Sequence, residues 1–309
     1  MPVTFQIERE IEECDDRLYD AEPSALSVQG FDNVSADDVR RYHEQGYLVV
    51  KGAYSPERAE RGRLELQAMT GMDDPQCSSV DYEWGIWRLV EARGFARRAA
   101  GERDWSEEER TRLRETLLSI DPVTRGRLVR KFVGFTKHHP PLGELAHDPT
   151  LMGALAKLIG EPAKLYVSQA MIKPPGGREK PWHQDHAYFN YPIDTRIVGV
   201  WIALDQATAE NGCMRVLPGG HQSGPRPHWK RRDWQICDAD ILGQPIVSVP
   251  LDPGDALLFD GKIPHGTPPN RTEAIRWAVQ YHYVPARAEM VDEAIRLAAF
   301  GGEGTYVSC

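Results

Sequence analysis

The sequence lacks the features that mark secreted, membrane-spanning and nucleic-acid-binding proteins. Its five cysteines are scattered and form no Cys-X-X-Cys pair, which argues against a disulfide framework and a zinc finger. No stretch approaches the roughly 18 apolar residues of a membrane span, and the acidic N-terminus lacks the apolar run of a signal peptide. A net charge of −9 argues against a nucleic acid or an anionic membrane as partner. Together these absences predict a cytoplasmic protein.

The rest of the composition is ordinary for a globular protein with a substantial core. Of its 309 residues, 41% are hydrophobic and 27% are charged. Residues 1–30 are polar and acidic with weak periodicity, and we expect them to form an N-terminal arm. Because sandwich and barrel proteins often exceed 200 residues as one unit, residues 31–300 are expected to form a single domain, followed by a tail over residues 301–309.

Capping signals and hydrophobic periodicity divide this domain into a helical first half and a strand-rich second half. Residues 72–130 are interpreted as a polar, mostly helical insert that packs outside a sheet or serves as a lid or dimer surface. From residue 164 the apolar pattern becomes that of strands, and a final helix is expected from Arg287 to about Phe300. This order predicts an α+β protein with a mainly β core, either a sandwich or a barrel. Earlier helices are expected to start at four capping sites, namely Ser35, Ser55, Ser106 and Asp148.

A candidate metal site begins in the stretch Pro181–His186. In an extended strand, residues i and i+2 point to the same face, so His183 and Asp185 converge on one point. A histidine and a carboxylate are two of the three ligands in the facial triad of non-haem Fe(II) oxygenases. His265 follows a strand and a turn much later in the chain, and it supplies the third ligand if two adjacent strands bring these residues together.

Two residues close to His265 are candidates for binding a carboxylate. Arg276 opens the last strand, where a buried guanidinium presents a fork to a carboxylate co-substrate, and Thr267 offers a hydroxyl to the same group. Arg271 is the competing arginine. We prefer Arg276 because the alternation of residues 276–281 gives it a defined strand face.

These motifs together resemble the phytanoyl-CoA dioxygenase family of Fe(II)- and 2-oxoglutarate-dependent oxygenases. The resemblance covers residues 35–285 and implies a double-stranded β-helix (a cupin-like jelly roll) with flanking helices. The insert has no recognisable counterpart in the family, and Gly220 replaces the serine of the usual Pro-Gly-Ser-His motif. The matching motifs are Trp182–Asp185, Glu210–Gly212, Val216–His221, Pro264–Thr267 and Arg276.

The resemblance also implies roles for individual residues. His183, Asp185 and His265 would bind Fe(II), and Arg276 and Thr267 would hold the far carboxylate of 2-oxoglutarate. Further residues are expected around the co-substrate or the substrate. Those near the co-substrate are Trp201, Gln169 and, on a looser alignment, Lys131. Those of the substrate pocket are Lys173, which shares a strand face with Gln169, and Tyr188, Phe189 and His186.

Several of these residues have a simpler alternative. His186 is out of phase with the ligands, so a solvated loop histidine fits as well as a pocket wall. Tyr188 and Phe189 equally suit core packing. The cluster Lys230–Asp233 is interpreted as a solvated loop, with an anion clamp for the substrate as the alternative.

The implied reaction is oxidation of a C–H bond in a small organic substrate, with O2 consumed and succinate and CO2 released. Related halogenases replace the ligand carboxylate with a small residue, so Asp185 favours hydroxylation, desaturation or ring closure. One alternative is a jelly-roll protein that binds a metal or ligand without turnover. Another is a zinc-dependent hydrolase, because zinc accepts the same ligands. The substrate stays open between a CoA ester, an amino acid and a secondary metabolite, and a monomer or a homodimer is expected.

Overall fold

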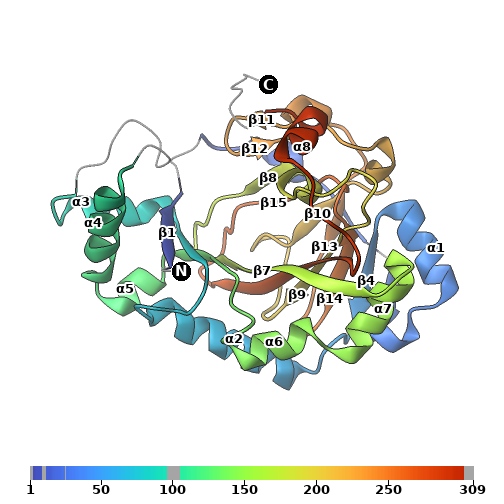
Figure 1. Cartoon of the computed structure of the whole chain (residues 1–309), viewed down its shortest axis with the longest axis horizontal. Helices are drawn as coiled ribbons and strands as arrows, with labels where there is room; N and C mark the ends of the chain where they lie inside the picture. The colour runs from blue at the N-terminus through green and yellow to red at the C-terminus, as the bar shows by residue number, and fades with distance from the viewer. Residues whose placement is uncertain (1–2, 9–11, 25, 96–104, 303–309) are drawn as a thin grey trace.

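The computed structural model describes residues 3–8, 12–24, 26–95 and 105–302, which form two β-sheets surrounded by helices (Figure 1). The larger sheet has nine strands, in the order β1 (Thr4–Ile7), β5 (Ser79–Tyr82), β6 (Val129–Val133), β7 (Ala163–Lys173), β16 (Arg276–Pro285), β9 (Val198–Ala203), β14 (Ala256–Asp260), β4 (Tyr47–Lys51) and β3 (Ser27–Gln29). The smaller sheet has five, in the order β2 (Glu22–Pro23), β13 (Val247–Val249), β10 (Met214–Val216), β15 (His265–Thr267) and β8 (Lys180–His183). A separate pair is formed by β11 (Trp229–Lys230) and β12 (Trp234–Gln235).

Eight of these strands, four in each sheet, form the core of the fold. The chain passes back and forth between the sheets, with β7, β9, β14 and β16 in the larger sheet and β8, β10, β13 and β15 in the smaller one. The four in the larger sheet are neighbours and pair antiparallel. This is the expected double-stranded β-helix, which is therefore confirmed, although the two sheets of the described chain stay open and do not close into one barrel.

The central strands are apolar on both faces because they are covered on both sides. On β9, Val200 and Ile202 pack into the cluster shared with the helices, whereas Trp201 and Ala203 pack into the cluster between the sheets. Successive residues of a strand point to opposite faces, so a doubly covered strand reads as a continuous apolar run. All six residues of β9 are buried.

Helices cover the outside of this core (Figure 1). The capping boxes expected at Ser35 and Ser106 are both present, with Asp38 and Glu109 as their partners. Along the larger sheet lie α1 (Ala36–Gln45), α2 (Pro56–Gly71), α6 (Pro140–Ala146) and α7 (Pro149–Ile159). Beside β1 lie α3 (Trp87–Glu91), α4 (Glu107–Leu118) and α5 (Pro122–Gly126), and near β11 and β12 lies α8 (Glu293–Phe300).

Three segments differ from what the sequence suggested. Residues 1–30, expected to form an arm, contribute strands to both sheets, and β1 pairs parallel with β5. The segment 72–130, expected to be mostly helical, also supplies β5 and the first residues of β6. The last helix begins at Glu293 and not at Arg287, because the Asp292 side chain caps it by accepting a hydrogen bond from the Ala294 backbone. Among the described residues, no helix is both long and apolar enough to cross a bilayer.

Candidate metal and co-substrate site

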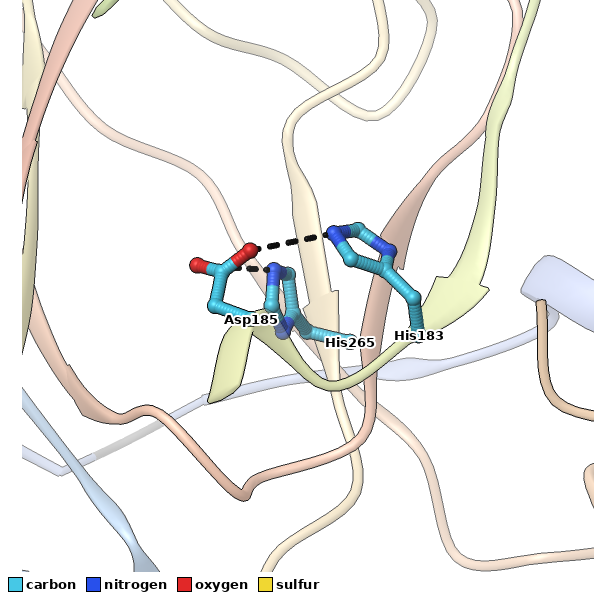
Figure 2. Close-up of side chains that lie close together, drawn as sticks. All are labelled: His183, Asp185 and His265. Atoms are coloured by element: carbon cyan, nitrogen blue, oxygen red, sulfur yellow. Dashed lines mark ion pairs between the residues drawn. The ribbon is translucent and has the colours of Figure 1, made fainter. Parts of the chain in front are cut away.

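Three buried side chains converge between the two sheets (Figure 2). His183 ends β8 and His265 begins β15, and the two residues face each other across this antiparallel pair. Asp185 is the first residue of the short 3-10 helix η5 (Asp185–Tyr188). Its carboxylate oxygens lie 3.2 Å from His183 Nε2 and 3.6 Å from His265 Nε2. The ligand atoms of the three residues all lie within 4.8 Å of one another, as a single metal ion requires.

Each imidazole is oriented by the backbone carbonyl of the residue two positions before it. His183 Nδ1 lies 2.7 Å from the Pro181 carbonyl, and His265 Nδ1 lies 3.0 Å from the Ile263 carbonyl. Because a carbonyl only accepts hydrogen bonds, each Nδ1 carries the hydrogen and each Nε2 presents a lone pair to the centre. This is how proteins fix the tautomer of a metal-binding histidine.

The charges of the group fit a cation at its centre. Burial lowers the pKa of His265 to about 3, with His183 contributing, so this ring is neutral at pH 7. Burial alone raises the pKa of Asp185, but His265 and His282 bring it well below its usual value, so the carboxylate is ionised. Two lone pairs and a negative charge that face one another at this range suit a divalent metal.

The sequence reasoning missed two side chains that hold Asp185. The Gln280 amide donates a hydrogen bond to Asp185 Oδ2 at 2.9 Å, and His282 Nε2 lies 2.7 Å from the same oxygen. Both residues lie on β16, at even spacing from Arg276, so they share its strand face. This even spacing from Arg276 is visible in the sequence and could have identified Gln280 and His282 as the partners of the Asp185 carboxylate.

A cavity of about 270 Å³ opens beside the three ligands. It is lined by every residue expected in the site except His186. His186 is neither a wall of the cavity nor a solvated loop histidine, because it is fully buried within η5. The His186 ring lies instead near the Phe300 ring, with Nε2 3.4 Å from the Tyr191 carbonyl.

The inner end of the cavity holds two buried basic side chains, Arg276 and Lys173. Arg276 donates to the Gly212 carbonyl at 2.7 Å and to the Met171 carbonyl at 3.2 Å, and its guanidinium lies 5.1 Å from the Trp201 ring centre. Burial lowers the pKa of Arg276 to about 10, which leaves it positive at pH 7. Beside it, Lys173 Nζ donates to Thr267 Oγ1 at 2.7 Å. Within the described chain, no carboxylate lies within ion-pair distance of either side chain.

The competing arginine is placed far from this chemistry. Arg271 forms an ion pair with Asp16 at the surface, and its side chain is 60% exposed. The geometry therefore leaves Arg276 as the arginine that faces the cavity.

The outer wall of the cavity consists of a row of polar side chains on neighbouring strands. Gln6 of β1 pairs in register with Asp81 of β5, which pairs in turn with Lys131 of β6 and then Met171 of β7. Lys131 Nζ lies 2.5 Å from Asp81 Oδ2, so its charge is already compensated. Glu8 follows β1 and pairs with Arg130 and Arg178.

The cluster Lys230–Asp233, interpreted as a solvated loop, is partly buried in this wall. Arg232 is only 4% exposed and pairs with Glu179 and with Asp238. Asp233 lines the cavity and pairs with Lys180 at 2.7 Å. The charges of Arg232 and Asp233 are therefore paired with other side chains of the wall and do not face solvent freely.

Comparisons of the sequence with known proteins agree with this geometry. The family model described as phytanoyl-CoA dioxygenase (PhyH) matches residues 42–278. A probable phytanoyl-CoA dioxygenase of Caenorhabditis elegans is 32% identical over 277 residues, which cover 81% of this chain and 75% of that protein. The peroxisomal phytanoyl-CoA dioxygenase of Mus musculus is 31% identical over 290 residues, covering 88% and 76%.

Solved structures share the fold at lower sequence identity. The carbocyclase SnoK from nogalamycin biosynthesis, described as non-heme and alpha ketoglutarate dependent, superimposes with a TM-score of 0.56 at 21% identity, over 94% of this chain and 97% of that one. EvdO2 from Micromonospora carbonacea var. aurantiaca, solved with 2-oxoglutarate, gives a TM-score of 0.55 at 23% identity, over 87% and 97%. These likenesses support the double-stranded β-helix assignment.

Proposed function

Because the chain belongs to the phytanoyl-CoA dioxygenase family of Fe(II)- and 2-oxoglutarate-dependent oxygenases, we propose that His183, Asp185 and His265 bind its iron. The orientation of the two histidines carries this proposal. Each keeps Nε2 free toward the centre because Nδ1 is engaged by a backbone carbonyl. A non-catalytic ligand-binding protein would not need this arrangement together with a buried arginine, Arg276, in the adjoining cavity that has no carboxylate partner among the described residues.

His183, Asp185 and His265 would hold the iron together, and the adjoining cavity would admit the co-substrate. When bound, iron, 2-oxoglutarate and O2 would together provide the oxidant for a C–H bond, with succinate and CO2 as by-products. The protein's task is to bind, orient and exclude water. Gln280 and His282 hold the Asp185 carboxylate through one oxygen, Oδ2, so that Oδ1 stays directed at the centre.

Arg276 is proposed to hold the far carboxylate of 2-oxoglutarate, with Thr267 as a second donor. Arg276 and Gln280 lie on one face of β16, four residues apart, which corresponds to roughly 13 Å along the strand. The cavity runs between the cation and the metal ligands and is lined by both ends of this span. Trp201 packs against the guanidinium and restricts its position. Gln169 also lines this space.

The retained carboxylate of Asp185 supports hydroxylation, desaturation or ring closure rather than halogenation. For the substrate, we propose a small polar molecule that is neutral or zwitterionic. The acids and bases of the outer wall pair with one another, as in Lys131 with Asp81 and Lys180 with Asp233. Such a wall offers hydrogen bonds without a net charge, which suits a CoA ester poorly. Tyr188 and Phe189 line the cavity near the ligands and are proposed to contact the substrate.

Spectroscopy and product analysis test the function. Fe(II) and 2-oxoglutarate, added to the full-length protein without oxygen, should give a weak visible charge-transfer band. Admission of O2 should then release succinate. Absence of both the band and succinate would overturn the oxygenase proposal, and hydrolytic turnover supported by zinc alone would replace it with the hydrolase alternative.

Two properties of the whole protein stay proposals. We propose a cytoplasmic location, to be checked by cell fractionation, and a monomer or homodimer, to be checked by light scattering after size-exclusion chromatography. A screen of small metabolites, scored by succinate release above the rate without substrate, would identify the substrate class.

A further inference from the structure

Lys173 is a buried basic side chain to which the proposed reaction gives no role. It ends β7 directly opposite Arg276 on β16, and its side chain is almost completely buried. Burial and the nearby positive charges of Arg276 and Arg130 keep its pKa well below the usual value for lysine. A carboxylate bound beside both groups would favour the ammonium form of Lys173, because an opposite charge stabilises the charged form.

The hydrogen bonds of Lys173 set the direction of the Thr267 hydroxyl. Lys173 Nζ donates to Thr267 Oγ1 at 2.7 Å and to the Pro268 carbonyl at 2.5 Å. A hydroxyl that accepts from an ammonium must turn its own hydrogen elsewhere. Among the described residues, no acceptor takes this hydrogen, and Thr267 lines the cavity. The hydroxyl is therefore a donor with a fixed direction and no protein partner.

The turn at Gly212 packs over both basic side chains. Its carbonyl accepts from Arg276, and its φ of 85° falls in the left-handed region that favours glycine. A Cβ atom at this position would come within 2.5 Å of the Pro268 carbonyl oxygen and 3.1 Å of Lys173 Nζ. The backbone thus closes over Lys173 and holds it against Thr267, which leaves the cavity side of the pair for a ligand.

We propose that Lys173 is a positioning residue for the far carboxylate of 2-oxoglutarate: it aims the Thr267 hydroxyl at that carboxylate and adds its charge to that of Arg276. This inference rests on the proposed function, because it deepens the co-substrate end of the same site. It replaces the earlier expectation that Lys173 contacts the substrate. The ligand chemistry it predicts is selectivity for a keto acid with a second carboxylate.

The test compares two keto acids of equal chain length. 2-Oxoglutarate has the far carboxylate, whereas 2-oxopentanoate lacks it and binds a metal through the same keto-acid end. Dissociation constants are measured without oxygen from the Fe(II) charge-transfer band for the wild type, Lys173→Met and Lys173→Gln. Lys164→Met is the matched control, because Lys164 lies exposed on the same strand and donates to the Ala288 carbonyl.

Lys173→Met should weaken 2-oxoglutarate binding by about 10- to 100-fold, the usual range for losing a buried hydrogen bond to a charged group. Its affinity for 2-oxopentanoate should stay within about twofold. Lys173→Gln retains a donor for Thr267 without the charge and should fall between Lys173→Met and the wild type. Lys164→Met should match the wild type for both acids.

A purely structural role would give a different pattern. If Lys173→Met bound 2-oxoglutarate as tightly as the wild type, or lost both keto acids equally, the role assigned to Lys173 would be overturned. Thr267→Val supplies an independent measurement if the lysine variants do not fold, since it should also lose 2-oxoglutarate selectively. A wild type that bound neither acid would instead refute the proposed function itself.

Discussion

The two ends of the cavity are held together by different kinds of contact. At the inner end, three functional side chains are bonded to the backbone, namely His183 to Pro181, His265 to Ile263 and Arg276 to Gly212, and only Asp185 is held by other side chains. At the outer wall, side chains are bonded to other side chains, as in Lys131 with Asp81 and Glu8 with Arg130. The backbone fold therefore fixes most side-chain positions at the inner end. At the outer wall, side-chain positions depend on which charged residues pair with one another.

This difference suggests separate roles for the two ends, with the reaction at the inner end and substrate selectivity at the outer wall. His183, His265 and Arg276 lie within the part of the chain that the family model matches, residues 42–278, as do Asp81 and Lys131 of the outer wall, whereas β1 lies outside it. Backbone contacts keep the ligands in place when surface residues change, because the backbone does not depend on side-chain identity. Paired side chains can be exchanged without disturbing the metal, so we expect the outer wall to determine the substrate and the inner end to determine the reaction.

The largest effect is expected from the metal ligands. His265→Ala should remove iron binding and lower succinate release by more than about 100-fold, because even residues that only orient a ligand typically cost 10- to 100-fold. Iron content after anaerobic loading and the succinate rate are the measurements. His147→Ala, an exposed histidine at the end of α6, is the control and should behave as the wild type. Retention of iron by His265→Ala would place the metal elsewhere.

Arg276 should show the next largest effect. Arg276→Met removes a buried charge from its proposed carboxylate partner, so the dissociation constant for 2-oxoglutarate should rise by about 100-fold or more while iron binding is kept. Arg271→Met removes an exposed arginine paired with Asp16 and should change neither. An unchanged affinity in Arg276→Met would make Lys131 the better candidate, and the two ends of the cavity would then not differ in function.

Much of the inner end could be predicted from the sequence, because strand periodicity and short motifs operate locally. His183, His265 and Arg276 each lie at a strand position that the alternation of residues defines. Gln280 and His282 follow the same alternation along β16. Confirmed elements such as the capping boxes at Ser35 and Ser106 also depend on residues only three apart.

The outer wall could not be predicted in this way. β1 pairs with β5, a partner some 75 residues later, and no local pattern encodes that choice. Arg232 and Asp233 belong to a charged run of a kind that usually faces solvent, and only the tertiary structure supplies the partners that permit their burial. The burial of His186 likewise depends on the turn into η5 at Asp185, and strand periodicity does not indicate where a strand ends.

Glu8 tests whether the outer wall depends on charge. Burial alone raises its pKa, but Arg130 and Arg178 lower it to about 2 from a usual value of 4.5. A lowered pKa in the folded state means that the carboxylate stabilises the fold above pH 4.5 and loses this contribution as the pH falls toward 2. Glu8→Gln should therefore reduce the free energy of unfolding by about 1 to 2 kcal/mol at pH 7, with a smaller difference at pH 3.5.

Urea denaturation at both pH values measures the effect of Glu8. Glu13→Gln changes an exposed carboxylate in the same N-terminal segment and should have no effect at either pH. A loss in Glu8→Gln that was equal at pH 7 and pH 3.5 would show that packing, and not the ion pairs, attaches β1. The affinity for 2-oxoglutarate should stay unchanged, since the Gly212 and Met171 carbonyls, and not Glu8, hold Arg276 in place.

Lys131 is expected to show the smallest effect. The sequence placed it near the co-substrate, whereas the structure places it in the outer wall beside Asp81. It lines the cavity, yet its ammonium lies 2.5 Å from Asp81, so it has little charge to offer a second carboxylate. Lys131→Met should change the dissociation constant for 2-oxoglutarate by no more than about threefold, within the range of weak, exposed ion pairs. The same variant should alter which metabolites stimulate succinate release. The contrary result would be that Lys131→Met weakens 2-oxoglutarate binding as much as Arg276→Met does. That result would show that an outer-wall residue binds the co-substrate, and the proposed separation of roles between the two ends would be wrong.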